Sequence, residues 1–182
     1  MTARSGRDQE QKGERELIVR AQRYEPEPLA DLFAAHFDAV HRYVFTFLGD
    51  AELSDEVTRR VFLRALEGLP RFRRFESGFS TWLYRVANLV LSEAVRPGAA
   101  ELRAPGGSEA EVRLRQGLRT LTPDQLDVVG LRFVAGLPAA EVARATGRGL
   151  GRVQALQHRA LLALRRAAAG EPEEPQATAA VS

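Results

Sequence analysis

Residues 137–166 contain a break between two helical patterns, and this break constrains the fold more than any other stretch of the chain. The first pattern covers residues 139–145 and directs Val142 and Ala145 to the same side. Gly147 follows it, and glycine suits a tight turn because it adopts positive φ without a steric penalty. The stretch therefore predicts a short helix, a turn and a second helix.

The second helix of this stretch has one apolar face and one polar face. Its apolar residues recur at spacings of three and four and so share a side: Val153, Leu156, Ala160 and Leu164. The polar residues can all donate hydrogen bonds, and none is acidic: Arg152, Gln154, Gln157, His158 and Arg159. A helix-turn-helix with such an outer face is the geometry that enters a DNA major groove.

The charge of the chain supports a phosphate-facing surface near its C-terminal end. The whole sequence has a net charge of only +2, but residues 131–169 hold seven arginines against one acid, Glu141. Cysteine is absent, which excludes disulfides, thiolate metal sites and cysteine nucleophiles. No apolar run approaches the ~20 residues of a membrane helix, and the N-terminus lacks the apolar core of a signal peptide. We therefore expect a cytoplasmic protein.

The sequence gives little support to the hypothesis that the protein is an enzyme. His36 and His41 lie five residues apart, about 140° around a helix, and Asp38 completes no ligand set with them because no further ligand is evident. The chain has neither a glycine-rich phosphate loop nor a nucleophile elbow. We expect no metal, no cofactor and no catalytic residue.

The remaining sequence predicts helices and one linker. Apolar residues follow helical spacing over residues 29–48, 54–67 and 81–95, and no stretch has the alternation of a strand. Thr122 and Pro123 are typical of a helix start. We predict an all-α fold of two small helical domains joined by a short flexible linker, the second ending in the helix-turn-helix. The expected segments are a disordered tail (1–14), the first domain (15–96), the linker (97–110), the second domain (111–169) and another disordered tail (170–182).

Between the second and third predicted helices lies a loop rich in arginine and phenylalanine, residues 69–80. Its arginines can neutralise phosphates, and an exposed phenylalanine can stack on an unpaired base with a gain of roughly 1–3 kcal/mol. The alternative, which we favour for Phe72 and Trp82, is that these rings fill the helical core.

Several runs resemble one protein family. In the first half they are Asp50-Ala51-Glu52, residues 61–65 and above all residues 79–87, which read FSTWLYRVA. In the second half they are Leu121-Thr122-Pro123, Leu131-Arg132-Phe133, Glu141-Val142-Ala143 and His158-Arg159-Ala160. In this order, and separated by a linker, they resemble the two-domain sigma factors of bacterial RNA polymerase of the extracytoplasmic-function type.

The resemblance implies partners and roles. The first domain would bind core RNA polymerase and would open and read the minus-ten element of promoter DNA, while the second domain would read the minus-thirty-five element. Family members are often held by an anti-sigma factor. The minus-ten contacts would be Arg71, Phe72, Arg73, Arg74, Phe75, Phe79, Ser80, Trp82, Arg85 and Asn88. The polymerase contacts would be Asp55, Glu56, Arg59, Arg60 and Leu63, and the minus-thirty-five contacts Arg148, Arg152, Gln154, Gln157, His158 and Arg159.

Two of the predicted helices depart from the family pattern. Arg59 and Arg60 place two cations in the helix that docks on polymerase, which motivates an alternative function: a sigma-like DNA-binding regulator that does not itself support initiation. In the recognition helix Leu156 occupies a usually basic position. We expect this helix to be rotated so that Leu156 is buried and Gln157 faces outward.

Substitutions in the recognition helix test this division of roles. Glutamine pairs bidentately with adenine, so Gln157→Ala should relax base preference with little change in the salt dependence of DNA binding. Arg152→Ala should instead lower the salt slope by about one unit, because one phosphate contact is lost. Binding titrations at several salt concentrations measure both effects, and the reverse pattern contradicts the assignment.

Overall fold

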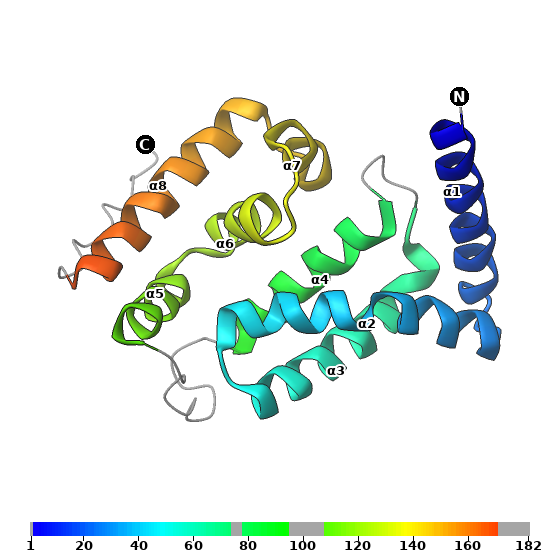
Figure 1. Ribbon diagram of the computed structural model, residues 1–182, viewed down its shortest axis with the longest axis horizontal. Helices are drawn as coiled ribbons and strands as arrows, with labels where there is room; N and C mark the ends of the chain where they lie inside the picture. Colours follow the sequence, from blue (N-terminus) through cyan, green and yellow to red (C-terminus); the bar gives the residue numbers. More distant parts are fainter. Residues whose placement is uncertain (1, 74–77, 95–107, 171–182) are drawn as a thin grey trace, which may run out of the picture.

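The structure is a computed structural model that describes residues 2–73, 78–94 and 108–170, with side chains from residue 12 onward. Every element in these ranges is helical, which confirms the all-α prediction (Figure 1). Arg74, Phe75 and most of the predicted linker and C-terminal tail lie outside the described residues.

The first domain consists of four helices. The helices α2, α3 and α4 pack on one another, and α1 lies across one end of α2 (Figure 1). Their core includes the fully buried residues Leu32, Val44, Val61 and Leu83. The bounds are α1 Thr2–Ala21, α2 Pro26–Leu48, α3 Ala51–Gly68 and α4 Gly78–Ala94, and a short 3-10 turn, Leu69–Arg71, follows α3.

The second domain also has four α-helices. The long helix α8 packs against α5, α6 and α7, so it is the common support of this domain (Figure 1). The bounds are α5 Glu109–Thr120, α6 Pro123–Val129, α7 Ala139–Thr146 and α8 Leu150–Ala169. A single π turn, Gly130–Val134, extends α6 and ends where the amide of Ala135 donates to the carbonyl of Gly130 at 2.9 Å.

The N-terminal prediction is corrected, because α1 begins at Thr2 where a disordered tail over residues 1–14 was expected. The C-terminal turns of this helix are tied to the domain. Ile18 and Ala21 are buried in the core, and the side-chain amide of Gln22 donates to the carbonyls of Leu69 and Phe72 at 3.1 and 2.7 Å. This packing stabilises a helix whose polar sequence alone gives no apolar periodicity.

Helix starts follow capping chemistry. Thr122 caps α6 as predicted, in a capping box with Gln125. A helix was expected over residues 54–67, but α3 already begins at Ala51 because Asp50 caps it, accepting from the amide of Leu53 at 2.8 Å. The predicted linker ran to residue 110, whereas α5 already begins at Glu109 because Ser108 forms a capping box with Glu111.

Three aromatic rings at the start of α4 belong to the core of the first domain. The rings of Phe72, Phe79 and Trp82 lie 5.1–5.4 Å apart between centroids. Phe72 is 6% exposed and Phe79 is 1% exposed. The burial of Phe72 agrees with the core position that we favour for it from the sequence, although the family resemblance also placed it among the minus-ten contacts. The burial of Phe79 corrects its assignment as a minus-ten contact, because in this structure its ring faces the helical core, where apolar burial holds it.

Replacing Phe79 measures how much this cluster stabilises the fold. Phe79→Ala should lower the free energy of unfolding by about 3–5 kcal/mol, because it removes a buried ring and leaves a cavity. The matched control is Leu63→Ala on the exposed face of α3, which should change it by under about 0.5 kcal/mol. Urea unfolding checks both values, and equal effects contradict a core role for Phe79.

Candidate nucleic-acid interface

The helix-turn-helix has the predicted geometry. The helix α7 ends at Thr146 and is followed by Gly147, whose φ of 67° lies in the left-handed region, and α8 starts at Leu150. Val142 and Ala145 are buried as expected. The apolar face of α8 is also buried as expected, at Val153, Leu156, Ala160 and Leu164. The turn therefore fixes the outer face of α8 relative to the rest of the second domain.

Most of the predicted recognition residues lie on that outer face. Their side chains are exposed in four cases: Arg152, Gln154, His158 and Arg159. Gln157 differs from the expectation because it is half-buried, and its side-chain oxygen Oε1 accepts from Nε of Arg132 at 3.2 Å. Arg132 also donates to the carbonyl of Leu137 at 2.5 Å. The π turn brings Arg132 beside α8, a contact that periodicity alone does not predict.

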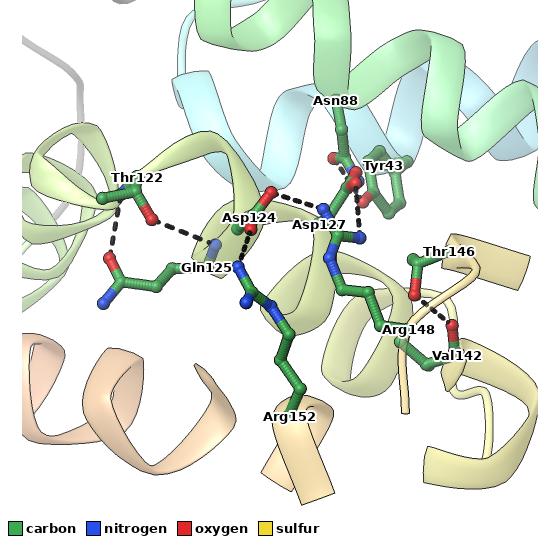
Figure 2. Close-up of polar contacts among 10 residues, drawn as sticks. All are labelled: Tyr43, Asn88, Thr122, Asp124, Gln125, Asp127, Val142, Thr146, Arg148 and Arg152. Carbon is green, nitrogen blue, oxygen red and sulfur yellow. Dashed lines mark hydrogen bonds and ion pairs between the residues drawn. The ribbon is translucent and has the colours of Figure 1, made fainter. Parts of the chain in front are cut away.

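Two carboxylates of α6 face the arginines of the helix-turn-helix (Figure 2). Arg148 forms ion pairs with Asp124 and, at 3.5 Å, with Asp127. Arg152 pairs with Asp124 at 3.3 Å and remains 66% exposed. Neither acid was predicted from the sequence to be functional, although their spacing of three places them on one face of a helix. They hold Arg148, whose side chain is only 17% exposed.

The two carboxylates have opposite pKa shifts. Burial raises the pKa of Asp127, and a hydrogen bond from Asn88 and the charges of Arg85 and Arg148 oppose this shift only in part. Partial burial also acts to raise the pKa of Asp124, but hydrogen bonds and charge from Arg148 and Arg152 outweigh it, so that this pKa is lowered. Asp124 is therefore a stabilised carboxylate, whereas the ionised form of Asp127 is costly.

The predicted minus-ten residues are divided between the surface and the interior. Arg71 and Arg73 are exposed. Ser80 is half-buried, and its hydroxyl lies 3.5 Å from Nδ1 of His36.

Trp82 and Arg85 line a cleft between α4 and α6. Its volume is about 320 Å³, and Asp124 and Asp127 line its opposite wall. The cleft therefore brings an aromatic ring and a cation of the first domain beside the two acids of the second.

Asn88 also lines this cleft and is buried. It is only 3% exposed, its side-chain oxygen accepts from the hydroxyl of Tyr43 at 2.7 Å, and its side-chain nitrogen donates to Asp127 at 3.0 Å. In this arrangement Asn88 links the two domains and is not available at the surface.

The predicted polymerase contacts share the outer face of α3. Leu63 is 63% exposed, the highest value among the large apolar side chains of the described residues. Asp55 pairs with His41 at 2.9 Å, and Arg60 lies 3.9 Å from Glu93. Glu56 and Arg59 are exposed. The face thus combines one apolar side chain with charges of both signs.

Comparison with known proteins identifies the family. Models of sigma-70 region 2 and sigma-70 region 4 match residues 32–99 and 117–166. SigD of Mycobacterium tuberculosis, an ECF RNA polymerase sigma factor, is 30% identical over 148 residues, which cover 69% of this chain and 70% of SigD. The chain belongs to the ECF sigma factors.

Two further similarities agree with this family. BldN of Streptomyces coelicolor, another ECF RNA polymerase sigma factor, is 30% identical over 169 residues, which cover 83% of this chain but only 64% of BldN. The solved structure of CnrH in complex with the cytosolic domain of CnrY superposes with a TM-score of 0.61 at 22% identity, and the match covers 87% of this chain and 99% of CnrH. This likeness supports the two-domain helical fold.

Each of the two family matches falls on one of the two domains of this ECF sigma factor. The region 2 match begins at Leu32 in α2 and includes α3 and α4, and the region 4 match runs from Gly117 in α5 to Arg166 in α8. Among the described residues, no helix is long and apolar enough to span a membrane, and no cluster of acidic and histidine side chains could hold a metal ion.

The opposite pKa shifts of the two α6 acids predict opposite pH effects. Because the pKa of Asp124 is lowered by folding, its stabilisation is present above the ordinary aspartate pKa of about 3.9 and is lost as the pH falls through the lowered value. Asp124→Asn should be less stable than the parent at pH 7. At pH values below the lowered pKa of Asp124, the two proteins should be equally stable.

For Asp127, whose pKa is raised, stability is lost as the pH rises through the folded value. Asp127→Asn should therefore be less stable than the parent only at lower pH, where the parent carboxyl has gained its proton. Thermal melts across this pH range check both signs, and parallel curves for the two variants contradict the assigned environments.

Proposed function

We propose that this ECF sigma factor binds core RNA polymerase and directs it to specific promoters for transcription initiation. The observation that carries the proposal is the exposed, acid-free outer face of α8, held in a helix-turn-helix inside the region 4 match. Such a face reads base edges in the major groove while its arginines contact phosphates. The protein acts by binding promoter DNA and polymerase in the cytoplasm, without turnover or a cofactor.

In this proposal each domain contacts one promoter element. The outer face of α8 reads the minus-thirty-five element, with Gln154 and His158 toward the bases and Arg152 and Arg159 at phosphates. In the first domain, the exposed Arg71 and the neighbouring Arg73 contact phosphates of the minus-ten element.

The outer face of α3 is proposed as the surface that docks on polymerase. An exposed leucine surrounded by charges is suited to the centre of a protein interface, where a buried apolar anchor contributes most of the affinity. An anti-sigma factor is a second proposed protein partner. Its support is the shared fold of CnrH, which was solved with the cytosolic domain of CnrY.

The alternative is a sigma-like regulator that binds DNA or polymerase but does not support initiation. The observation that favours it is the pair of cations Arg59 and Arg60 on the docking face of α3. Run-off transcription separates the two functions: initiation by core polymerase with the purified chain supports the sigma function, and polymerase binding without transcripts supports the alternative.

One substitution tests the docking face directly. Leu63→Glu should abolish co-purification with core polymerase, because it places a charge at the centre of the proposed contact. Val19→Glu on α1 is the matched control, since Val19 is also exposed, at 49%, but lies outside the proposed surface. The control should retain binding, and both variants should keep the circular dichroism spectrum of the parent. Equal binding by both variants would remove the docking face from the proposal.

A further inference from the structure

The side chains assigned to two different promoter elements meet at one interface between the domains. We call it the interdomain interface. It consists of Tyr43 and Asn88 of the first domain and Asp127 of the second (Figure 2), together with Gly130 of the second domain. The carboxylate of Asp127 accepts from Asn88, a predicted minus-ten contact, and pairs with Arg148, a predicted minus-thirty-five contact. Asp127 therefore binds one predicted minus-ten contact and one predicted minus-thirty-five contact.

The backbone of the second domain fits closely against the first at Gly130. A Cβ atom at this position would lie 1.9 Å from the hydroxyl oxygen of Tyr43 and 3.1 Å from the side-chain oxygen of Asn88. Tyr43 cannot easily move away, because it is 2% exposed and its ring stacks on that of Tyr84 at 4.7 Å. The interface therefore requires glycine at position 130.

Apolar packing continues the contact on both sides of these polar groups. Leu126 and Val129 of α6 are buried in the same cluster as Val90 and Leu91 of α4 and the core residues of α2. Burial of apolar side chains on both domains stabilises the closed arrangement beyond its hydrogen bonds. The two domains are consequently held as one unit in this structure.

The closed arrangement hides part of the first domain from DNA. Asn88 is buried, and Arg85 lies in the cleft whose opposite wall carries Asp124 and Asp127. A carboxylate and a phosphate accept the same charge-assisted hydrogen bonds from a guanidinium. The acids of α6 thus take the places that DNA phosphates would occupy beside the arginines.

We propose that the interdomain interface masks the α4 surface of the sigma factor, and that Asp127 couples its opening to the capture of Arg148 by a DNA phosphate. When a phosphate draws Arg148 away, the partly buried carboxylate of Asp127 loses a cation, which destabilises the closed arrangement. Opening then exposes Asn88 and Arg85. The inference rests on the proposed function, since it takes α8 and α4 as DNA-binding surfaces.

The test follows the distance between the domains in the full chain. The sequence contains no cysteine, so Glu67→Cys on α3 and Leu161→Cys on α8 provide two exposed sites for a pair of labels. The parent should show one closed distance in the absence of DNA and a longer distance when a random-sequence DNA duplex is added. Anisotropy of the labelled duplex, recorded in the same titration, reports binding separately.

Gly130→Ala should open the interface without DNA. Alanine favours the helix at this position, so the second domain keeps its fold while the new methyl group pushes Tyr43 away. The matched control is Gly13→Ala, because a Cβ at this helical glycine meets nothing within 4 Å. The control should stay closed. Adding Tyr43→Phe to Gly130→Ala removes the clashing oxygen and should shift the distance back toward the parent value.

Asp127→Asn tests the coupling. Asparagine can still accept from Asn88 but carries no charge, so this variant should stay closed and should not open when the duplex binds. In Gly130→Ala, the salt slope of binding should steepen by about 0.9 because Arg85 becomes free to meet a phosphate.

Three results would overturn the proposal: an unchanged distance in Gly130→Ala, a parent that binds the duplex yet stays closed, or DNA-driven opening in Asp127→Asn. Absence of any duplex binding, which anisotropy detects, also overturns the coupling, and run-off transcription with core polymerase then decides the proposed function separately. A parent that initiates transcription and binds DNA without a change in distance leaves the proposed function intact and refutes the coupling.

Discussion

The partly buried carboxylate of Asp127 organises the contact between the two domains of this sigma factor. An ionised carboxylate is costly away from water unless it is paired and hydrogen-bonded, and here Asn88 and Arg148 supply those partners. The same two side chains are a predicted minus-ten contact and a predicted minus-thirty-five contact. The stability of the closed arrangement and the availability of the proposed DNA-binding surfaces therefore depend on the same contacts, and under our proposal any ligand that competes for Arg148 acts on both.

The rest of the structure fixes these groups in place. The aromatic cluster around Phe79 holds the start of α4, and the buried face of α8 holds the helix-turn-helix against α6. The π turn after α6 sets Gly130 against Tyr43 and brings Arg132 to Gln157. A π turn inserts one residue into a helix and so redirects the side chains that follow, which is why such turns are frequent at functional sites.

Periodicity and capping chemistry predicted much of the fold. The apolar spacing of α8, the turn at Gly147 and the cap at Thr122 are local features, and local sequence specifies them. The interdomain interface could not be predicted in this way, because it depends on the close approach of Gly130 to Tyr43, residues far apart in the chain. For the same reason Asp127 was not recognised, and Phe79 was assigned to DNA although tertiary packing places it in the core.

The sole tryptophan of the chain offers the most direct measurement of the closed arrangement. Trp82 packs on the aromatic core with one side and lines the interdomain cleft with the other. Quenching of its fluorescence by acrylamide should be weak in the parent and in Gly13→Ala, and clearly stronger in Gly130→Ala, because opening of the interface admits the quencher. Equal quenching in all three proteins would contradict the account that the two domains close over this face of α4.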